Sequence, residues 1–188
     1  MKILGLSGSL RRDSYNAQLL RAAASELPPE AELELWDGVR DLPYYDEDID
    51  VDPAPERARS LRDAIAGADA LLISTPEYNA SVPGALKNAI DWASRPRATA
   101  ALKDKPVLVI GASTGLFGAV WAQAELRKVL KTAGANPLEE EVPVGQAHEA
   151  FDEHGSLRDP DLGIALADAV GALVREVAAP SEDAAVAA

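Results

Sequence analysis

Short, nearly continuous apolar runs alternate along the chain with longer segments in which apolar residues recur at spacings of three and four. The runs at residues 2–6, 70–73 and 106–110 are each followed by small or hydroxyl-bearing residues, a pattern typical of strands covered on both faces. Residues 32–36 and, more weakly, residues 138–144 indicate two further strands. We therefore expect a sheet of five strands.

The segments between and after these runs predict five amphipathic helices, because each segment places its apolar residues on one stripe. The stripes fall within residues 19–27, 58–68, 82–93, 120–133 and 162–177. Strands that alternate with helices indicate an α/β fold with a doubly wound parallel sheet. A short first strand–helix unit and right-handed crossovers favour the strand order 2-1-3-4-5. In such a sheet, ligands bind at the carboxyl ends of the first, third and fourth strands.

A single domain accounts for most of the chain. We expect it to span residues 1–178, since the sequence shows no internal repeat and no linker between two units. Residues 179–188 lack a periodic apolar stripe, so we expect this tail to fray.

Charge and cysteine content exclude several classes of function. The 188 residues include 18 basic and 31 acidic side chains, and the formal charge of −13 argues against nucleic-acid or anionic-membrane partners. The absence of cysteine excludes disulfides, thiolate metal sites and a cysteine nucleophile. No apolar run approaches the ~20 residues that cross a bilayer. The first arginines follow an apolar stretch, the reverse of a secretory signal, so we expect a cytoplasmic protein.

The loop after the first expected strand, residues 7–16, carries groups that suit a phosphate. Main-chain N–H groups at a helix start are joined by the hydroxyls of Ser9 and Ser14, the amide of Asn16 and the guanidinium of Arg11. Hydroxyls stand where a pyrophosphate-binding loop has glycines, which favours a terminal monophosphate. The alternative is a helix capped by Ser14, with arginines in solvent.

The loop after the third expected strand, residues 75–84, suits a flat heterocycle. Two prolines with asparagine and glycine exclude helix until about Val82 and leave main-chain groups exposed. Tyr78 adds an aromatic face. The alternative is an ordinary turn that leads into a capped helix.

The loop after the fourth expected strand, residues 111–119, allows a ligand to approach closely, because three of its nine positions are glycine. It also spells the G-x-S-x-G pattern of serine hydrolases around Ser113. A hydrolase would need His148 or His154 together with an acid, and the expected helix begins late after Ser113. The hydrolase is therefore the least favoured interpretation.

No metal site is predicted. Aspartates alternate over residues 46–52 as in a calcium loop, but the sixth position is Val51 instead of glycine and the twelfth is Arg57 instead of glutamate. His148 and His154 have no further ligands at suitable spacing.

Taken together, the three loops resemble those of the NADPH-dependent FMN reductase family, flavodoxin-like proteins that include chromate, quinone and azo-dye reductases. The resemblance covers about residues 1–178. It rests on motifs that are specific as an ordered set: Gly8-Ser9-Leu10-Arg11 with Ser14 and Asn16, Leu42-Pro43 with Tyr45-Asp46-Glu47-Asp48, Thr75-Pro76-Glu77-Tyr78-Asn79, the stretch from Pro83 to Trp92, and Gln123 with Leu126-Arg127.

The resemblance implies a flavodoxin-like three-layer sandwich that binds FMN. In the family the first loop holds the phosphate, the second lies along the isoalloxazine ring and ribityl chain, and the third closes over the ring. Carried over position by position, these roles imply Ser9, Arg11, Ser14 and Asn16 for the phosphate, Pro76, Glu77, Tyr78 and Asn79 for the ring and ribityl chain, and Ser113 and Gly115 for the closing loop. The sequence departs from the usual family pattern at Thr114, Ala119 and Trp121.

The resemblance also implies an enzyme. NADPH or NADH would pass hydride to FMN, and the reduced ring would pass electrons to a quinone, azo, metal-oxyanion or flavin acceptor. Because the flavin does the chemistry, no side chain is predicted to be catalytic. Similar proteins pair as homodimers or assemble as homotetramers, so we expect one of these states. Two alternatives are kept: an FMN-binding electron carrier or redox sensor, and a serine hydrolase that uses Ser113.

Overall fold

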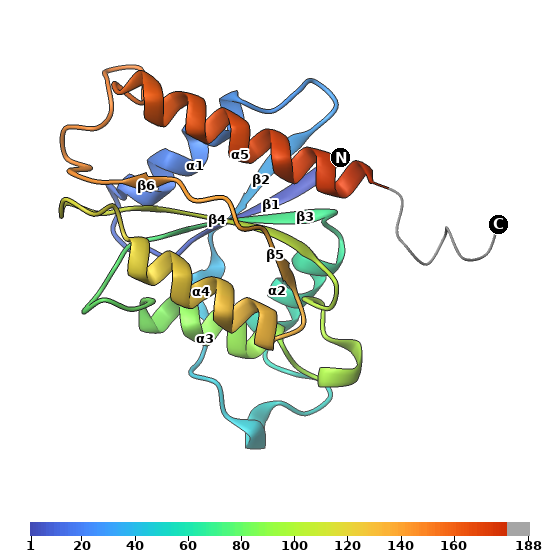
Figure 1. Ribbon diagram of the computed structural model, residues 1–188. Helices are drawn as coiled ribbons and strands as arrows, with labels where there is room; N and C mark the ends of the chain where they lie inside the picture. The colour runs from blue at the N-terminus through green and yellow to red at the C-terminus, as the bar shows by residue number, and fades with distance from the viewer. Residues whose placement is uncertain (180–188) are drawn as a thin grey trace.

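The computed structural model describes residues 1–179 as six strands and five helices (Figure 1). The strands are β1 (Lys2–Ser7), β2 (Glu32–Trp36), β3 (Ala70–Thr75), β4 (Pro106–Ala112), β5 (Asn136–Pro137) and β6 (Pro143–Val144). The helices are α1 (Tyr15–Ser25), α2 (Glu56–Ala66), α3 (Gly84–Ala93), α4 (Val120–Thr132) and α5 (Pro160–Ala178). Short 3₁₀ turns lie at Gly38–Asp41, Glu47–Ile49 and Arg97–Thr99.

The strands form one parallel sheet in the order β2-β1-β3-β4-β5. Leu4 of β1 pairs with Glu34 of β2 on one side and with Leu71 of β3 on the other. Helices α1 and α5 cover one face of the sheet, and α2, α3 and α4 cover the other (Figure 1). The predicted three-layer α/β sandwich with strand order 2-1-3-4-5 is confirmed.

The prediction of one strand over residues 138–144 is wrong. β5 and β6 are separate two-residue strands that pair with opposite ends of β4. Both contain a proline, which has no N–H to donate to a ladder. Residues 139–141 between them are three exposed glutamates that leave the sheet, because a carboxylate is costly to bury; Glu141 pairs with Arg127 of α4.

Each face of the sheet has its own apolar core, because successive side chains of a strand point to opposite faces. Leu4 and Leu6 of β1 pack in the cluster under α2, α3 and α4, whereas Ile3 packs in the cluster under α1 and α5. All of β3 is buried. Coverage on both faces explains why the central strands are continuous apolar runs instead of alternating ones.

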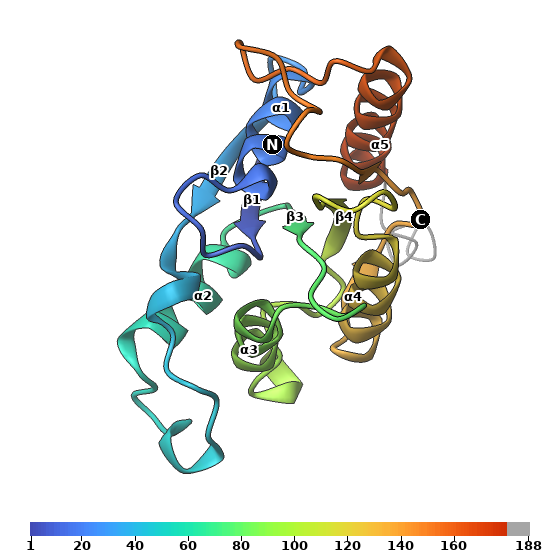
Figure 2. The ribbon, with the colours of Figure 1, turned by 90° about the vertical axis from the view of Figure 1, so that its left-hand side faces the viewer.

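A connection between β2 and α2 projects from the body of the domain (Figure 2). This segment, residues 43–54, is named the arm. Trp92 Nε1 of α3 donates a hydrogen bond to Pro43 O at 2.8 Å, at the base of the arm. Farther along, Arg62 Nη2 of α2 lies 2.8 Å from Asp50 Oδ1, and both side chains are largely buried. The arm is therefore fixed to the domain by its inner side.

Within residues 1–179, no helix is both long enough and apolar enough to span a bilayer. The last helix runs to Ala178, as the apolar stripe predicts. The expected fraying of residues 179–188 lies outside the described residues, apart from Ala179. The single domain over residues 1–178 stays a prediction.

Candidate functional site

The loops that follow β1, β3 and β4 lie side by side at the carboxyl edge of the sheet (Figure 2). They are named loop 1 (residues 8–14), loop 2 (76–83) and loop 3 (113–119). The three strands are parallel neighbours, so the topology itself brings the loops together. Gly8 N donates a hydrogen bond to Ser74 O at 2.8 Å, which holds loop 1 against the end of β3.

Asn16 joins three elements at the base of loop 1. It lies in the first turn of α1 and is 3 % exposed. Its Oδ1 accepts hydrogen bonds from Ala112 N at 3.0 Å and Ser74 Oγ at 2.8 Å, and its Nδ2 donates to Ala112 O at 3.0 Å. The carboxamide therefore ties α1 to the ends of β3 and β4. This structural role was not predicted; its signal was an asparagine beside the buried stripe of α1. Phosphate binding by Asn16 stays a prediction.

Loop 1 places hydroxyl and main-chain donors at the start of α1. Ser14 is the N-cap of this helix, and its Oγ accepts a hydrogen bond from Ala17 N at 3.2 Å. Ser9 Oγ accepts one from Arg11 N at 3.4 Å. The predicted cap by Ser14 is confirmed. A hydroxyl that accepts one hydrogen bond still has its own proton to donate, so the capping serine can also bind an anion. Phosphate binding by Ser9 and Ser14 stays a prediction.

Arg11 lies exposed on the outer side of loop 1. Its Nη2 donates to Asp13 O at 3.4 Å, and its Cζ lies 5.3 Å from the centre of the Tyr15 ring. A hydrogen bond of this length is weak. The guanidinium is therefore held only loosely where it is, and turning it towards an anion at the start of α1 costs little.

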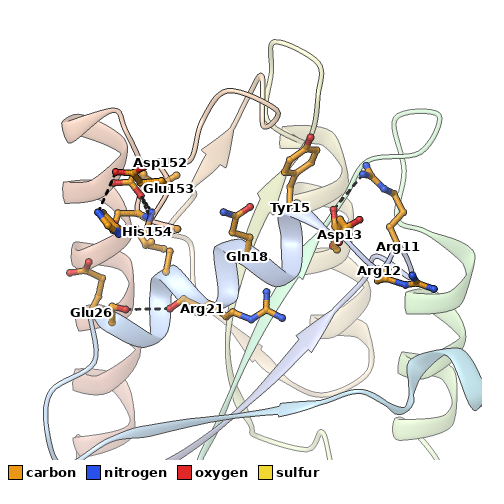
Figure 3. Close-up of a pocket in the computed structure, with 17 residues that line it drawn as sticks. Arg11, Arg12, Asp13, Tyr15, Gln18, Arg21, Glu26, Asp152, Glu153 and His154 are labelled. Carbon is orange, nitrogen blue, oxygen red and sulfur yellow. Dashed lines mark hydrogen bonds and ion pairs between the residues drawn. The ribbon is translucent and has the colours of Figure 1, made fainter.

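A cleft of about 760 Å³ runs along α1 from loop 1 to residues 152–157 (Figure 3). Within the described chain, loops 2 and 3 contribute nothing to its lining. The backbone N–H groups of Ser156 and His154 hold the pKa of Asp152 below its usual value. The cleft is lined by three arginines, Arg11, Arg12 and Arg21, and by four carboxylates, Asp13, Glu26, Asp152 and Glu153. Because carboxylates outnumber arginines, the cleft as a whole does not select an anion.

Loop 2 contains a two-residue turn. Tyr78 N donates to Ser81 O at 3.0 Å, and Ser81 N donates back to Tyr78 O at 3.1 Å. The residues between them, Asn79 and Ala80, have φ angles of 53° and 58°, as in a type I′ turn. Pro76 before the turn is buried, whereas Tyr78 is half-exposed. The turn is confirmed, and contact with a flat heterocycle stays a prediction.

Glu77 connects loop 2 to the start of α4. Ala119, the N-cap residue of α4, has a left-handed backbone with φ of 62° and makes no side-chain cap. Glu77 Oε2 supplies that cap by accepting a hydrogen bond from Ala122 N at 3.1 Å. In return, Glu125 Oε2 accepts one from Val82 N at 3.3 Å. The Glu77 carboxylate also faces the positive end of the α4 dipole. Loop 2 and α4 are therefore fastened to each other.

Loop 3 is fastened to β6 and the residues after it. Ser113 N donates to Val144 O at 3.0 Å, and Ser113 O accepts from Ala147 N at 2.9 Å. Gly115 O accepts a hydrogen bond from Gln146 N at 2.9 Å. Ser113 is partly buried and Gly115 is exposed. Loop 3 is therefore preformed, while its contact with a cofactor ring stays a prediction.

Gly118 lies where loop 3 comes closest to the strand β6. Its φ angle is 60°, and a Cβ at this position would lie 2.3 Å from the carbonyl carbon of Pro143. Gln123, which is fully buried, donates a hydrogen bond from Nε2 to Gly118 O at 3.0 Å. The close approach requires glycine at this position.

The geometry does not form a hydrolase triad. α4 begins only at Val120, so Ser113 is not at a sharp strand-to-helix elbow. Within residues 1–179, neither His148 nor His154 forms a hydrogen bond with Ser113. The Nε2 of each histidine lies instead near the neighbouring glutamate in sequence, at 3.6 and 3.7 Å.

The donors at the sheet edge fit a phosphate ester that carries a flat ring. The first N–H groups of α1 have no intrahelical acceptor, and the helix dipole makes this end attractive to an anion. Ser9 and Arg11 lie at the same end. Loops 2 and 3 then offer the half-exposed Tyr78 ring and the exposed backbone of Gly115. These residue types fit the phosphate and the flat ring of FMN, while the place of each part of the cofactor stays a prediction.

Comparison with known protein families gives a consistent result. A sequence model of the family described as NADPH-dependent FMN reductase matches residues 1–149. The chain is 45 % identical over 160 residues to an NAD(P)H-dependent FMN reductase of Pseudomonas aeruginosa, and the match covers 85 % of each protein. It is 50 % identical over 129 residues to a 2-hydroxy-1,4-benzoquinone reductase of a Burkholderia species, with 69 % of each protein covered.

Solved structures include similar chains. FerB, a flavoenzyme NAD(P)H:(acceptor) oxidoreductase from Paracoccus denitrificans, has a TM-score of 0.83 at 38 % identity, with 94 % of this chain and 96 % of FerB covered. An azoreductase from Bacillus anthracis has a TM-score of 0.60 at 17 % identity, with 92 % of this chain and 98 % of that one covered. The second likeness concerns the fold alone.

Proposed function

Because the chain belongs to the NADPH-dependent FMN reductase family, we propose that it passes hydride from NADPH or NADH to FMN and then electrons to a quinone, azo, metal-oxyanion or flavin acceptor. The chain is therefore a flavin-dependent oxidoreductase. The observation that carries this function is the meeting of loops 1, 2 and 3 at one edge of the sheet. One of them offers donors for an anion, and the other two offer preformed backbone for a flat ring.

Loop 1 anchors FMN through its phosphate in this proposal. Ser9 and Ser14 donate hydroxyl protons, and Arg11 adds a cation at the N-terminus of α1. Asn16 uses one Nδ2 proton for Ala112 O, so its second proton is available to the ligand. These groups hold the cofactor by its charged end.

Loops 2 and 3 orient the ring. When bound, FMN supplies the hydride acceptor at its N5 atom. The side chains and backbone of the two loops hold the ring in place and keep one face accessible to a nicotinamide and then to an acceptor. None of them has to act as an acid or a base. The residues in these roles are Pro76, Glu77, Tyr78 and Asn79 of loop 2, and Ser113 and Gly115 of loop 3.

Replacing Arg11 with alanine is expected to weaken FMN binding by about 1.5–3 kcal/mol, the value of a hydrogen bond to a charged group. Titration of the apoprotein with FMN, followed by calorimetry or flavin fluorescence, measures the change. Arg12→Ala is the matched control, since Arg12 is also exposed but has no predicted contact with the phosphate. Unchanged FMN affinity in Arg11→Ala would remove Arg11 from the site.

The proposed activity is tested with the FMN-loaded protein under anaerobic conditions. Addition of NADPH or NADH is expected to bleach the flavin absorption band at ~450 nm rapidly, and a quinone is expected to restore it. A protein that binds FMN but is reduced by neither nicotinamide would be an electron carrier or redox sensor. A protein that fails to bind FMN would contradict the proposed function altogether.

We also infer that the protein forms a homodimer or a homotetramer. The outer side of the arm exposes apolar side chains next to carboxylates: Tyr44, Ile49 and Val51 beside Asp46, Glu47 and Asp48. A groove between α3 and α4 has an excess of positive charge around the apolar Ile90 and Val129. Its Lys87 is paired with Asp91, and the further cations are Arg95, Arg97 and Lys128. Light scattering on the FMN-loaded protein measures the assembly, and a monomeric mass would contradict it.

We place the protein in the cytoplasm. The cysteine-free sequence and the need for NADPH or NADH support this location. Immunoblotting of fractionated cells tests it, and recovery outside the cytoplasmic fraction would contradict it.

A further inference from the structure

Three large apolar side chains are exposed where loop 3 meets α4. Leu116 is 71 % exposed, Phe117 is 59 % exposed and Trp121 is 50 % exposed. The rings of Phe117 and Trp121 pack edge to face, with their centres 5.2 Å apart and their planes at 68°. These three residues are named the apolar shelf. Exposed aromatic groups of this size on one short segment are unusual for a surface that binds neither a ligand nor a partner.

The shelf is held firmly despite its exposure. Close packing fixes the backbone under Leu116, because a Cβ on Gly145 would lie 2.2 Å from Leu116 O. The first turn of α4, which carries Trp121, is fixed by the hydrogen bond from Ala122 N to Glu77. The backbone that carries these side chains therefore needs little reordering to receive a ligand, which favours binding.

The shelf also borders the predicted ring site. Leu116 follows Gly115 directly, and the cap by Glu77 fastens the start of α4 to the loop that carries Tyr78. A molecule that approaches the open face of the ring between loops 2 and 3 therefore meets the shelf. The half-exposed Tyr78 adds another aromatic group on the side of loop 2.

Positive charge is missing from this region of the sequence. Residues 75–84 and 111–126 include no lysine, arginine or histidine, but they include Glu77 and Glu125. Arg127, just beyond them on α4, is paired with Glu141. The carboxylates of Glu77 and Glu125 lie at the junction of loop 2 with α4, within hydrogen-bond distance of Ala122 N and Val82 N. NADPH and NADH carry their negative charges on phosphates remote from the nicotinamide ring, so the repulsion falls on a small anionic acceptor, whereas an uncharged aromatic acceptor gains apolar contact area without that cost.

We propose that the apolar shelf is the acceptor subsite, where Phe117 and Trp121 select uncharged planar quinones over anionic acceptors. This inference rests on the proposed function and adds its specificity-determining residues. In the reaction, NAD(P)H, one proton and a quinone give NAD(P)⁺ and the hydroquinone, with the hydride and the proton supplying two electrons and two hydrogens. An anionic acceptor such as ferricyanide takes one electron per ion, so two ions are reduced and one proton is released for each NAD(P)H.

The test compares 1,4-naphthoquinone with ferricyanide in the FMN-loaded enzyme. In a ping-pong mechanism, kcat/KM for an acceptor reports only the half-reaction in which that acceptor takes part. Changes in nicotinamide binding therefore do not affect the comparison of the two acceptors. Trp121→Ala and Phe117→Ala are each expected to lower kcat/KM for the quinone by about tenfold, the effect of an aromatic contact of about 1.4 kcal/mol. The value for ferricyanide is expected to change less than about twofold.

Trp121→Lys adds a positive charge to the shelf as well as removing the ring. It is expected to lower kcat/KM for the quinone and to raise that for ferricyanide severalfold, because opposite charges attract the ion to the subsite. Ile164→Ala is the matched control. Ile164 is also an exposed apolar residue, but it lies on α5, which covers the sheet face opposite α4, and both acceptors are expected to react as with the wild type.

The outcomes separate this inference from the function on which it rests. A wild-type enzyme that transfers electrons to neither acceptor contradicts the proposed function. An active wild type whose Trp121 and Phe117 variants lose both acceptors in parallel contradicts the shelf alone. A change in the mass measured by light scattering, together with a parallel loss, would show that the shelf contacts a second copy of the chain, and would likewise overturn the proposal.

Discussion

Replacing Asn16 with leucine is expected to lower the free energy of unfolding by at least about 3 kcal/mol, because three buried polar groups lose their partner at ~1–3 kcal/mol each. These groups are Ser74 Oγ, Ala112 N and Ala112 O. Leucine keeps the number and branching of the side-chain heavy atoms but is bulkier than asparagine, so overpacking of the buried site adds to the loss of hydrogen bonds. Urea unfolding followed by circular dichroism measures the lost stability as a lower midpoint at an unchanged slope.

The matched control for this substitution is Asn136→Leu. Asn136 is exposed and donates one hydrogen bond from Nδ2 to Asp104 O at 3.3 Å. Its acceptor returns to water when the side chain is replaced, so the free energy of unfolding is expected to change by less than about 1 kcal/mol. Equal stability of the two variants would contradict the role of Asn16 as the tie between α1, β3 and β4. The part that Asn16 plays in phosphate binding is measured separately, by FMN titration of Asn16→Leu at a low temperature at which the variant is still folded.

Most of the helices and strands could be predicted, because each is determined by the pattern of apolar residues within its own segment of sequence. Residues 70–73 and 106–110 are apolar throughout because β3 and β4 are covered on both faces, and this leaves a clear signal in the sequence. The strand order follows from the handedness of parallel crossovers. The separate strands β5 and β6 could not be predicted, because a strand of two residues is too short to show the pattern of apolar residues by which strands are recognised.

The candidate site could be predicted only in part. The meeting of the three loops follows from the sheet, and the cap at Ser14 follows from the residue type at a helix start. The cap that Glu77 provides for α4 could not be predicted, since it joins residues 45 positions apart and depends on the distance between loop 2 and that helix. The only local signal was Ala119, which cannot cap the helix it precedes.

Replacing Gly118 with alanine is expected to displace loop 3 and to weaken FMN binding by about tenfold or more, a change of roughly 1.4 kcal/mol. The φ angle of 60° costs an L-residue about 1–2 kcal/mol. The new Cβ would also lie 2.3 Å from the carbonyl carbon of Pro143, and relieving such a contact typically costs about 1–3 kcal/mol. Loop 3 must therefore move away from β6, and the hydrogen bond from Gln123 to Gly118 O is lost with it.

The free energy of unfolding of Gly118→Ala is accordingly expected to fall by about 2–4 kcal/mol in denaturant titrations. Gly163→Ala is the control. Gly163 lies in α5, and a Cβ there meets nothing within 4 Å, so alanine is expected to stabilise the helix by about 0.5–1 kcal/mol. Both variants add one methyl group. A lower free energy of unfolding in Gly118→Ala together with a higher one in Gly163→Ala would show that the loss comes from the contact between loop 3 and β6. If Gly118→Ala kept both its stability and its FMN affinity, loop 3 would not be preformed, and the fixed apolar shelf next to it would lose its physical basis.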